Sequence, residues 1–174
     1  MPFNEYFDTT VDDKIIVHNT LNGIIIDKYI EDIDEFRSTL EADNSSPLTP
    51  IESKGRKKYP LGCIKTYKSF MILAFTHFNE QNMAYLTKVD YEQCLMRMWK
   101  EISRTYANKP INLPLLGSGI TRFIDVPKKS NFDFLKCMLC TLKTSGENIN
   151  QPITILLTKD IMQEINIYEM KGVI

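Results

Sequence analysis

The stretch Leu113-Pro-Leu-Leu-Gly-Ser-Gly-Ile-Thr-Arg122 carries an apolar run directly into a turn that contains two glycines. The apolar run, residues 111–116, predicts a strand, and Pro114 predicts a bulge or the end of that strand. Gly117 and Gly119 let the backbone turn sharply and lie close to a ligand, which side chains would prevent. Successive backbone N–H groups in such a turn form a concave anion site, and ligands of open α/β sheets bind beyond the carboxyl ends of strands. We therefore expect this loop to bind phosphate, although it is neither a Walker A loop nor a complete dinucleotide fingerprint.

A second loop of the same kind occurs near the N-terminus. Residues 14–18, Lys-Ile-Ile-Val-His, predict a short buried strand, and Asn19-Thr-Leu-Asn-Gly23 follows as a turn. Apolar residues then recur every three or four positions and predict one amphipathic helix through Ile26, Ile30, Ile33, Phe36 and Leu40. A strand, a short turn and a helix aim backbone N–H groups at an anion. Two such loops at one edge of a sheet would hold the two phosphates of a pyrophosphate between them.

The rest of the pattern predicts an α/β fold, with a mixed sheet and helices packed on both faces. Residues 42–60 predict a long surface loop, whose basic run 54–58 is either solvated or a contact for a ligand or partner. Thr87 with Asp90 predicts a helix start. The other predicted elements are a hairpin of residues 62–67 and 70–76, helices of residues 87–106 and 132–143, and strands of residues 152–158 and 165–170. No repeat or boundary interrupts this order, so we expect a single domain over residues 1–174.

The composition is that of a soluble globular protein. A chain of 174 residues is long enough to bury a core without disulfides or a structural metal. Its 43% hydrophobic and 25% charged residues argue against disorder, and its net charge of −1 provides no field that would attract nucleic acid or an anionic membrane. No apolar run approaches the roughly 20 residues of a membrane span, and the N-terminus lacks the features of a signal peptide. We therefore expect a cytoplasmic location.

The cysteines and histidines do not predict a metal or redox site. Cys137 and Cys140 have C-x-x-C spacing, but they lie within an apolar pattern of helical period and no second pair or histidine cluster completes four ligands. We expect reduced core thiols and no cofactor. His18 adjoins the first loop, whereas His77 follows a strand and has no partner that the sequence reveals.

These residues resemble the macro domain family, whose members bind ADP-ribose between two loops. Residues 11–23 look like the loop after the family's Ile-Val-Asn-type strand, and residues 114–120 look like its Pro-Leu-Leu-Gly-x-Gly-Ile loop. Residues 60–66 are similar to its Gly-x-(Ala/Val)-x-x-Thr segment. A narrower similarity, to the macro domain of Thoeris antiphage-defence effectors, spans most of the chain and rests on residues 7–9, 19–23, 73–78, 91–96 and 114–123. The resemblance implies a three-layer α/β/α fold with a mixed central sheet.

The resemblance also implies a sensor. In that family a partner TIR-domain enzyme makes a signal from NAD, which in the type II systems is histidine-ADP-ribose, and the macro domain senses it. Transmembrane helices carry out the toxic step. The implied partners are thus an ADP-ribose-like small molecule and a TIR-domain enzyme, with no nucleic acid and with membrane contact only through segments absent from this chain. The location would be the cytoplasm, or the cytoplasmic face of the bacterial inner membrane in a full-length protein. Homo-oligomerisation is left open.

An ADP-ribosyl hydrolase acting on modified protein or nucleic acid is the alternative. Hydrolysis needs a water activated near the distal ribose. The first loop lacks the tri-glycine run of such hydrolases and has no acidic residue beside Asn19, and Asp27, one helical turn beyond, is expected to face solvent. We therefore favour sensing without catalysis.

The resemblance and the loop pattern together predict the ligand contacts. The expected residues are Asp8, His18, Asn19, Thr20, Leu21, Gly23, Leu116, Gly117, Ser118, Gly119, Ile120, Thr121, Arg122 and Phe123. Asp8 either accepts a hydrogen bond from adenine or is a turn residue. Arg122 either neutralises phosphate, caps the following segment or forms a surface ion pair. His18 either touches the ligand or is structural, and the aromatic ring of Phe123 is expected in the core with those of Tyr91 and Trp99.

Overall fold

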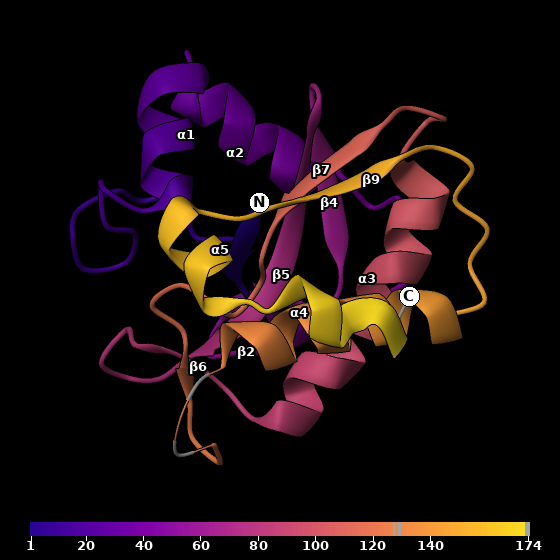
Figure 1. Cartoon of the computed structure of the whole chain (residues 1–174). Coiled ribbons are helices and arrows are strands. Elements are labelled where there is room, and N and C mark those ends of the chain that lie inside the picture. Colours follow the sequence, from indigo (N-terminus) through magenta and orange to yellow (C-terminus); the bar gives the residue numbers. More distant parts are fainter. Residues whose placement is uncertain (127, 129, 173–174) are drawn as a thin grey trace. The chain divides into compact units, whose positions relative to one another are not determined.

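The computed structural model describes residues 1–126, 128 and 130–172, and it divides the chain into two compact units, Met1–Tyr85 and Leu86–Ile174 (Figure 1). Each unit is described by itself, so the expectation of a single domain stays a prediction. Along the chain, the boundary between the units falls within β6 (Ala84–Leu86), a short strand that the sequence pattern does not predict.

The first unit is built on a mixed sheet around β5 (Phe70–Phe78). β1 (Pro2–Asn4) pairs with β5 in parallel, and β4 (Ile64–Tyr67) pairs with it antiparallel. β6 pairs antiparallel with the last residues of β5. The predicted hairpin of β4 and β5 is confirmed, with Lys68 adopting a φ of 51° in its turn. β1 has no periodic signal because it is three residues long.

Two short helices and a second hairpin complete the first unit. α1 (Leu21–Tyr29) and α2 (Ile33–Ala42) lie at the indigo end of the chain in Figure 1, and α2 packs against β4. Phe36 of α2 lies edge-on to Phe3 and Tyr67, with ring centroids 6.4 and 4.9 Å away. Buried aromatic and aliphatic side chains from both helices and the sheet therefore form one core.

Three expectations for this unit were wrong. The single helix is two, because the Asp32 side chain accepts hydrogen bonds from the N–H groups of Asp34 and Glu35 and starts a new helix. Residues 14–18 form no strand: the Asp12 carboxylate accepts from the N–H groups of Lys14 and Ile15, which curls the backbone away from any ladder. Only an isolated bridge, Val11 to Ile16, remains there.

The third wrong expectation is the long loop of residues 42–60. It contains the antiparallel hairpin of β2 (Ile51–Ser53) and β3 (Arg56–Lys58). Lys54 and Gly55 connect the strands with φ values of 52° and 72°. Positive φ at both central residues is characteristic of a two-residue hairpin turn of type I′, whose twist matches that of the flanking strands.

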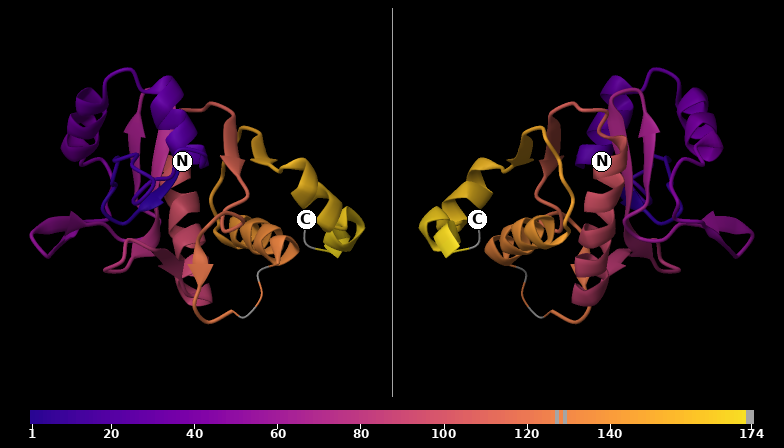
Figure 2. Two further views of the ribbon diagram at one scale, coloured as in Figure 1. Left: turned by 90° about the vertical axis from the view of Figure 1, so that its left-hand side faces the viewer. Right: turned by 90° about the vertical axis from the view of Figure 1, so that its right-hand side faces the viewer.

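The second unit combines a parallel strand pair with packed helices. β7 (Ile111–Pro114) and β9 (Ile153–Leu156) lie side by side in Figures 1 and 2. α3 (Lys88–Thr105) packs against α4 (Asn131–Thr144), and the Trp99 indole N–H donates to the Thr141 hydroxyl at 3.0 Å. The remaining elements are β8 (Arg122–Phe123), α5 (Lys159–Glu164) and the 3-10 helix η1 (Ile167–Gly172).

Several expectations for this unit are confirmed. Thr87 and Asp90 form a reciprocal capping box at the start of α3, and the predicted apolar stripe of that helix is buried. Pro114 ends β7, as its missing N–H suggests.

Two expectations were wrong. β9 is not buried, since Leu156 is 56% exposed. The expected last strand is η1, because Asn166 accepts the N–H of Tyr168 on its side chain and that of Glu169 on its carbonyl.

Candidate functional site

The loop after β7 is shaped by Gly117. Gly117 has a φ of +90°, a conformation that a side chain disfavours, and a Cβ there would lie 3.3 Å from the ring of Phe134. The Ser118 hydroxyl donates to the Leu115 carbonyl at 2.7 Å, which closes the turn. Leu115 and Leu116 are buried, so the loop is fixed to its unit on one side.

Gly119 plays a different part. A Cβ added there meets no atom within 4 Å, and the residue is exposed. The missing side chain is therefore not required by packing inside the loop. The absence of a side chain on this exposed side of the loop lets a ligand come close to the turn, as a phosphate-binding loop needs.

Tyr91 of α3 supports the loop from the interior. Its hydroxyl donates to the Leu116 carbonyl at 3.0 Å and also lies 3.4 Å from the Phe134 carbonyl. Burial raises the pKa of Tyr91, so the hydroxyl stays protonated and remains a donor. The rings of Tyr91, Phe123 and Phe134 contact one another, with centroids 4.9 to 5.6 Å apart. The helical stripe identifies Tyr91 as a core residue, but nothing in the sequence indicates the partner of its hydroxyl.

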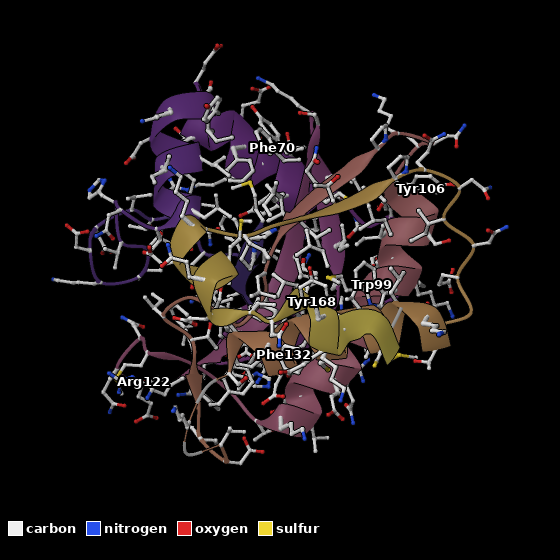
Figure 3. All side chains as sticks on the ribbon, viewed as in Figure 1. Phe70, Trp99, Tyr106, Arg122, Phe132 and Tyr168 are labelled. Carbon is white, nitrogen blue, oxygen red and sulfur yellow. The ribbon has the colours of Figure 1, made fainter. Side chains whose placement is uncertain are left out.

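The residues after Gly119 differ in exposure. Ile120 is 68% exposed, whereas Thr121 is buried and Phe123 is half-buried against Tyr91. Arg122 is exposed on β8 (Figure 3) and forms no ion pair with any residue that the structure describes. The surface ion pair considered for Arg122 is thus not observed, and its guanidinium remains available to an anion.

The first loop is organised by Thr20, the N-cap of α1. The Thr20 hydroxyl donates to the Val17 carbonyl at 2.7 Å and accepts the N–H of Gly23 at 3.2 Å. A Cβ at Gly23 would lie 2.4 Å from the Val17 oxygen and 2.8 Å from the His18 Cα. Gly23 is therefore required by packing, and its N–H is already occupied. The exposed residues of this loop are His18, Asn19 and Leu21.

His18 and Asp27 form a surface pair. Nδ1 of His18 lies 2.8 Å from Oδ2 of Asp27, and this hydrogen bond raises the pKa of His18. Asp27 is exposed as expected, but its carboxylate is engaged rather than merely solvated. The Asn19 side chain forms no hydrogen bond with any residue that the structure describes.

Asp8 lies in a turn that Asn4 organises. The Asn4 side-chain oxygen accepts the N–H groups of Tyr6 and Asp8, and its amide donates to Asp8 Oδ2 at 2.8 Å. The other carboxylate oxygen pairs with Arg56. The side chain of Asp8 is 18% exposed, and its carboxylate is held in one orientation by Asn4 and Arg56. Its hydrogen bond with adenine stays a prediction.

The sequence pattern missed a buried ionic group in the first unit. His77, expected to have no partner, contacts the carboxylate of Glu5, and Lys58 Nζ lies 3.2 Å from the same oxygen. Burial opposes the ionisation of Glu5, but the hydrogen bonds and charges of His77 and Lys58 outweigh it and lower the pKa of Glu5. Glu5 is thereby an ionised carboxylate with 2% of its side chain exposed.

Cys137 and Cys140 are half-buried on α4 and line a cavity of about 780 Å³, so they are not the core thiols expected. The described residues contain no group of three His, Cys, Asp or Glu side chains that would hold a metal ion. None of the helices in the described part of the chain is long and apolar enough to cross a membrane.

The two loops belong to different units, so their pairing as a pyrophosphate clamp stays a prediction.

Comparisons with known proteins agree with the loop pattern. The family model of the macro domain of Thoeris protein ThsA matches residues 1–158. The chain is 38% identical over 179 aligned residues to Thoeris protein ThsA of Bacillus amyloliquefaciens (strain Y2). The aligned region covers 97% of this chain and 60% of that protein. The chain thus spans less than two thirds of the length of this relative. The mixed α/β architecture and the resemblance are confirmed, and the chain belongs to the Thoeris ThsA macro domain family.

Proposed function

We propose that this chain is a sensor domain that binds an ADP-ribose-derived signalling nucleotide, such as histidine-ADP-ribose, and thereby activates an antiphage defence effector. The signal would be made from NAD by a TIR-domain partner enzyme. The chain spans 60% of its ThsA relative, so the effector activity of a whole protein is part of this proposal.

The observation that carries the proposal is the loop at Gly117–Gly119. Gly117 sets a left-handed turn, Tyr91 holds the preceding carbonyl, and Gly119 leaves the outer side of the backbone open. A turn whose shape is held before binding presents its N–H groups to phosphate at little ordering cost. The adjacent Arg122 adds a cation with no ion-pair partner in the described structure, and guanidinium groups pair well with phosphate.

Recognition without turnover is supported by the first loop. A hydrolase needs a side chain that places and activates water near the distal ribose. The acid closest in sequence after Asn19 is Asp27, and its carboxylate is occupied by His18 at 2.8 Å. The Gly23 N–H is occupied by Thr20. These contacts favour a loop that holds a ligand over one that performs chemistry on it.

Calorimetric titration with ADP-ribose and with histidine-ADP-ribose, alongside a hydrolysis assay on ADP-ribosylated protein, tests the proposal. We expect micromolar or tighter binding of at least one nucleotide and no turnover. Turnover that is lost in the Asn19→Ala variant would instead establish a hydrolase. Failure of both nucleotides to bind would eliminate both functions.

A further inference from the structure

A basic pocket lies within the first unit, on residues that the sensor proposal does not use for phosphate. It has a volume of about 350 Å³ and lies among the turn of residues 6–9, α2, β3 and β4. Four cations and one carboxylate line it: Arg37, Arg56, Lys57, Lys65 and Glu41. This volume is at the lower end of the range for pockets that hold small organic ligands.

Lys65 is the unusual member of this lining. Its side chain is buried, with 2% of the residue exposed, and it lies over the ring of Tyr59 with Nζ 4.1 Å from the centroid. Nζ donates to the Leu40 carbonyl and to the Tyr59 hydroxyl, the latter at 2.8 Å. An ammonium has three N–H donors, and in the described structure only these two have acceptors and no carboxylate pairs with Lys65. A buried ammonium without a counterion is costly, so an anion in the pocket would satisfy both its third donor and its charge.

The neighbouring guanidinium groups are held in place around this ammonium. Arg37 Nε donates to the Thr9 hydroxyl at 2.7 Å, and Arg37 Nη1 lies 3.4 Å from Oδ1 of Asp34. Arg56 pairs with Asp8 and lies over the ring of Tyr6, 4.5 Å from its centroid. Because these contacts use only some of the five N–H donors of each guanidinium, both retain donors for a ligand. Glu41, the one carboxylate in the lining, is exposed.

We propose that this pocket binds a small organic ligand through a phosphate group, with Lys65 as the buried donor and Arg37, Arg56 and Lys57 around it. A phosphate monoester carries close to two negative charges at neutral pH, which suits a lining with an excess of cations. The site is built entirely from the first unit, whereas the loop at Gly117–Gly119 lies in the second.

The test is a titration of the whole chain with inorganic phosphate, exchanged for chloride at constant ionic strength and followed by amide NMR. We expect saturating shifts at Thr9, Glu41 and Lys57, and these shifts should persist when ADP-ribose is present in excess. The Lys65→Met and Lys57→Gln variants should each weaken binding, and Lys65→Met by about tenfold or more because it removes a charge-assisted hydrogen bond. Lys54→Gln is the matched control, since Lys54 lies in the same hairpin, is 74% exposed and pairs with Glu80 outside the pocket.

Three outcomes would overturn the proposal. These are shifts that do not saturate, shifts confined to Gly117–Gly119, and equal effects of Lys57→Gln and Lys54→Gln. Shifts confined to the loop would leave the sensor function intact, so failure of one proposal is distinguishable from failure of the other. If Lys65→Met does not fold, the pair of hairpin variants decides the matter.

Discussion

The hydroxyl of Tyr91 donates a hydrogen bond to the carbonyl of Leu116 at 3.0 Å, which ties the interior of α3 to the residue before the Gly117 turn. Tyr91 and Leu116 are 2% and 3% exposed, so this bond is made away from water. Because both the donor and the acceptor are buried, moving Leu116 away from Tyr91 would leave two unsatisfied polar groups and cost free energy. The contact links helix packing to the shape of the proposed phosphate site.

Removing that hydroxyl should destabilise the chain and loosen the loop. In Tyr91→Phe the Leu116 carbonyl loses its partner, and we expect a loss of about 1–3 kcal/mol in the free energy of unfolding, with weaker nucleotide binding. Urea unfolding and calorimetry measure the two effects. Tyr106→Phe is the control, because no described residue hydrogen-bonds with the Tyr106 hydroxyl. Equal stability of the two variants would show that the bond contributes nothing.

An added methyl group should destabilise the first loop much more than the second. Gly23→Ala places a Cβ 2.4 Å from the Val17 oxygen, whereas Gly119→Ala places one in open space. We expect Gly23→Ala to cost about 2 kcal/mol or more, since overpacking against backbone has no cheap relief, and Gly119→Ala to cost less than about 1 kcal/mol. Urea unfolding of both variants checks this, and similar losses would refute the assignment of Gly23 to packing.

The Glu5 carboxylate should make the first unit sensitive to acid. In the folded chain its pKa lies below the ordinary value of 4.5. The stabilisation is therefore fully present above pH 4.5 and is lost as the pH falls through the lower folded value. We expect the difference in unfolding free energy between the wild type and Glu5→Gln to shrink as the pH falls below that value. A difference that stays constant over this range would argue against an ionised Glu5.

His18 should titrate above the ordinary range for histidine. The hydrogen bond that the protonated imidazole donates to Asp27 raises the pKa of His18 above its ordinary value of 6.5. NMR titration of the imidazole protons measures this directly, and Asp27→Asn should return the pKa of His18 toward that ordinary value. A wild-type pKa at the ordinary value would mean that the pair does not form in solution.

The sequence predicts this fold best where independent physical signals agree. The stripe through Tyr91 and Trp99 predicts α3 because core packing and helix capping agree there. The pattern fails where side chains compete for backbone groups: Asp12 organises a turn, and Asn166 the start of a 3-10 helix, where strands are expected. The loop at Gly117–Gly119 is predictable because glycine is needed locally. The group of Glu5, His77 and Lys58 is not predictable, because its members are brought together only by tertiary packing.

The central claim is that the backbone at Gly119 receives a phosphate of an ADP-ribose-like nucleotide. Calorimetric titration of Gly119→Val with ADP-ribose and histidine-ADP-ribose tests it most directly, because the open space around the Cβ position allows valine without disturbing the fold. Thr154→Val is the control, a near-isosteric change at an exposed position of β9 in the same unit. We predict that Gly119→Val folds normally and no longer binds, while Thr154→Val binds like the wild type. Wild-type affinity in a folded Gly119→Val variant would contradict the claim and remove this loop from the site.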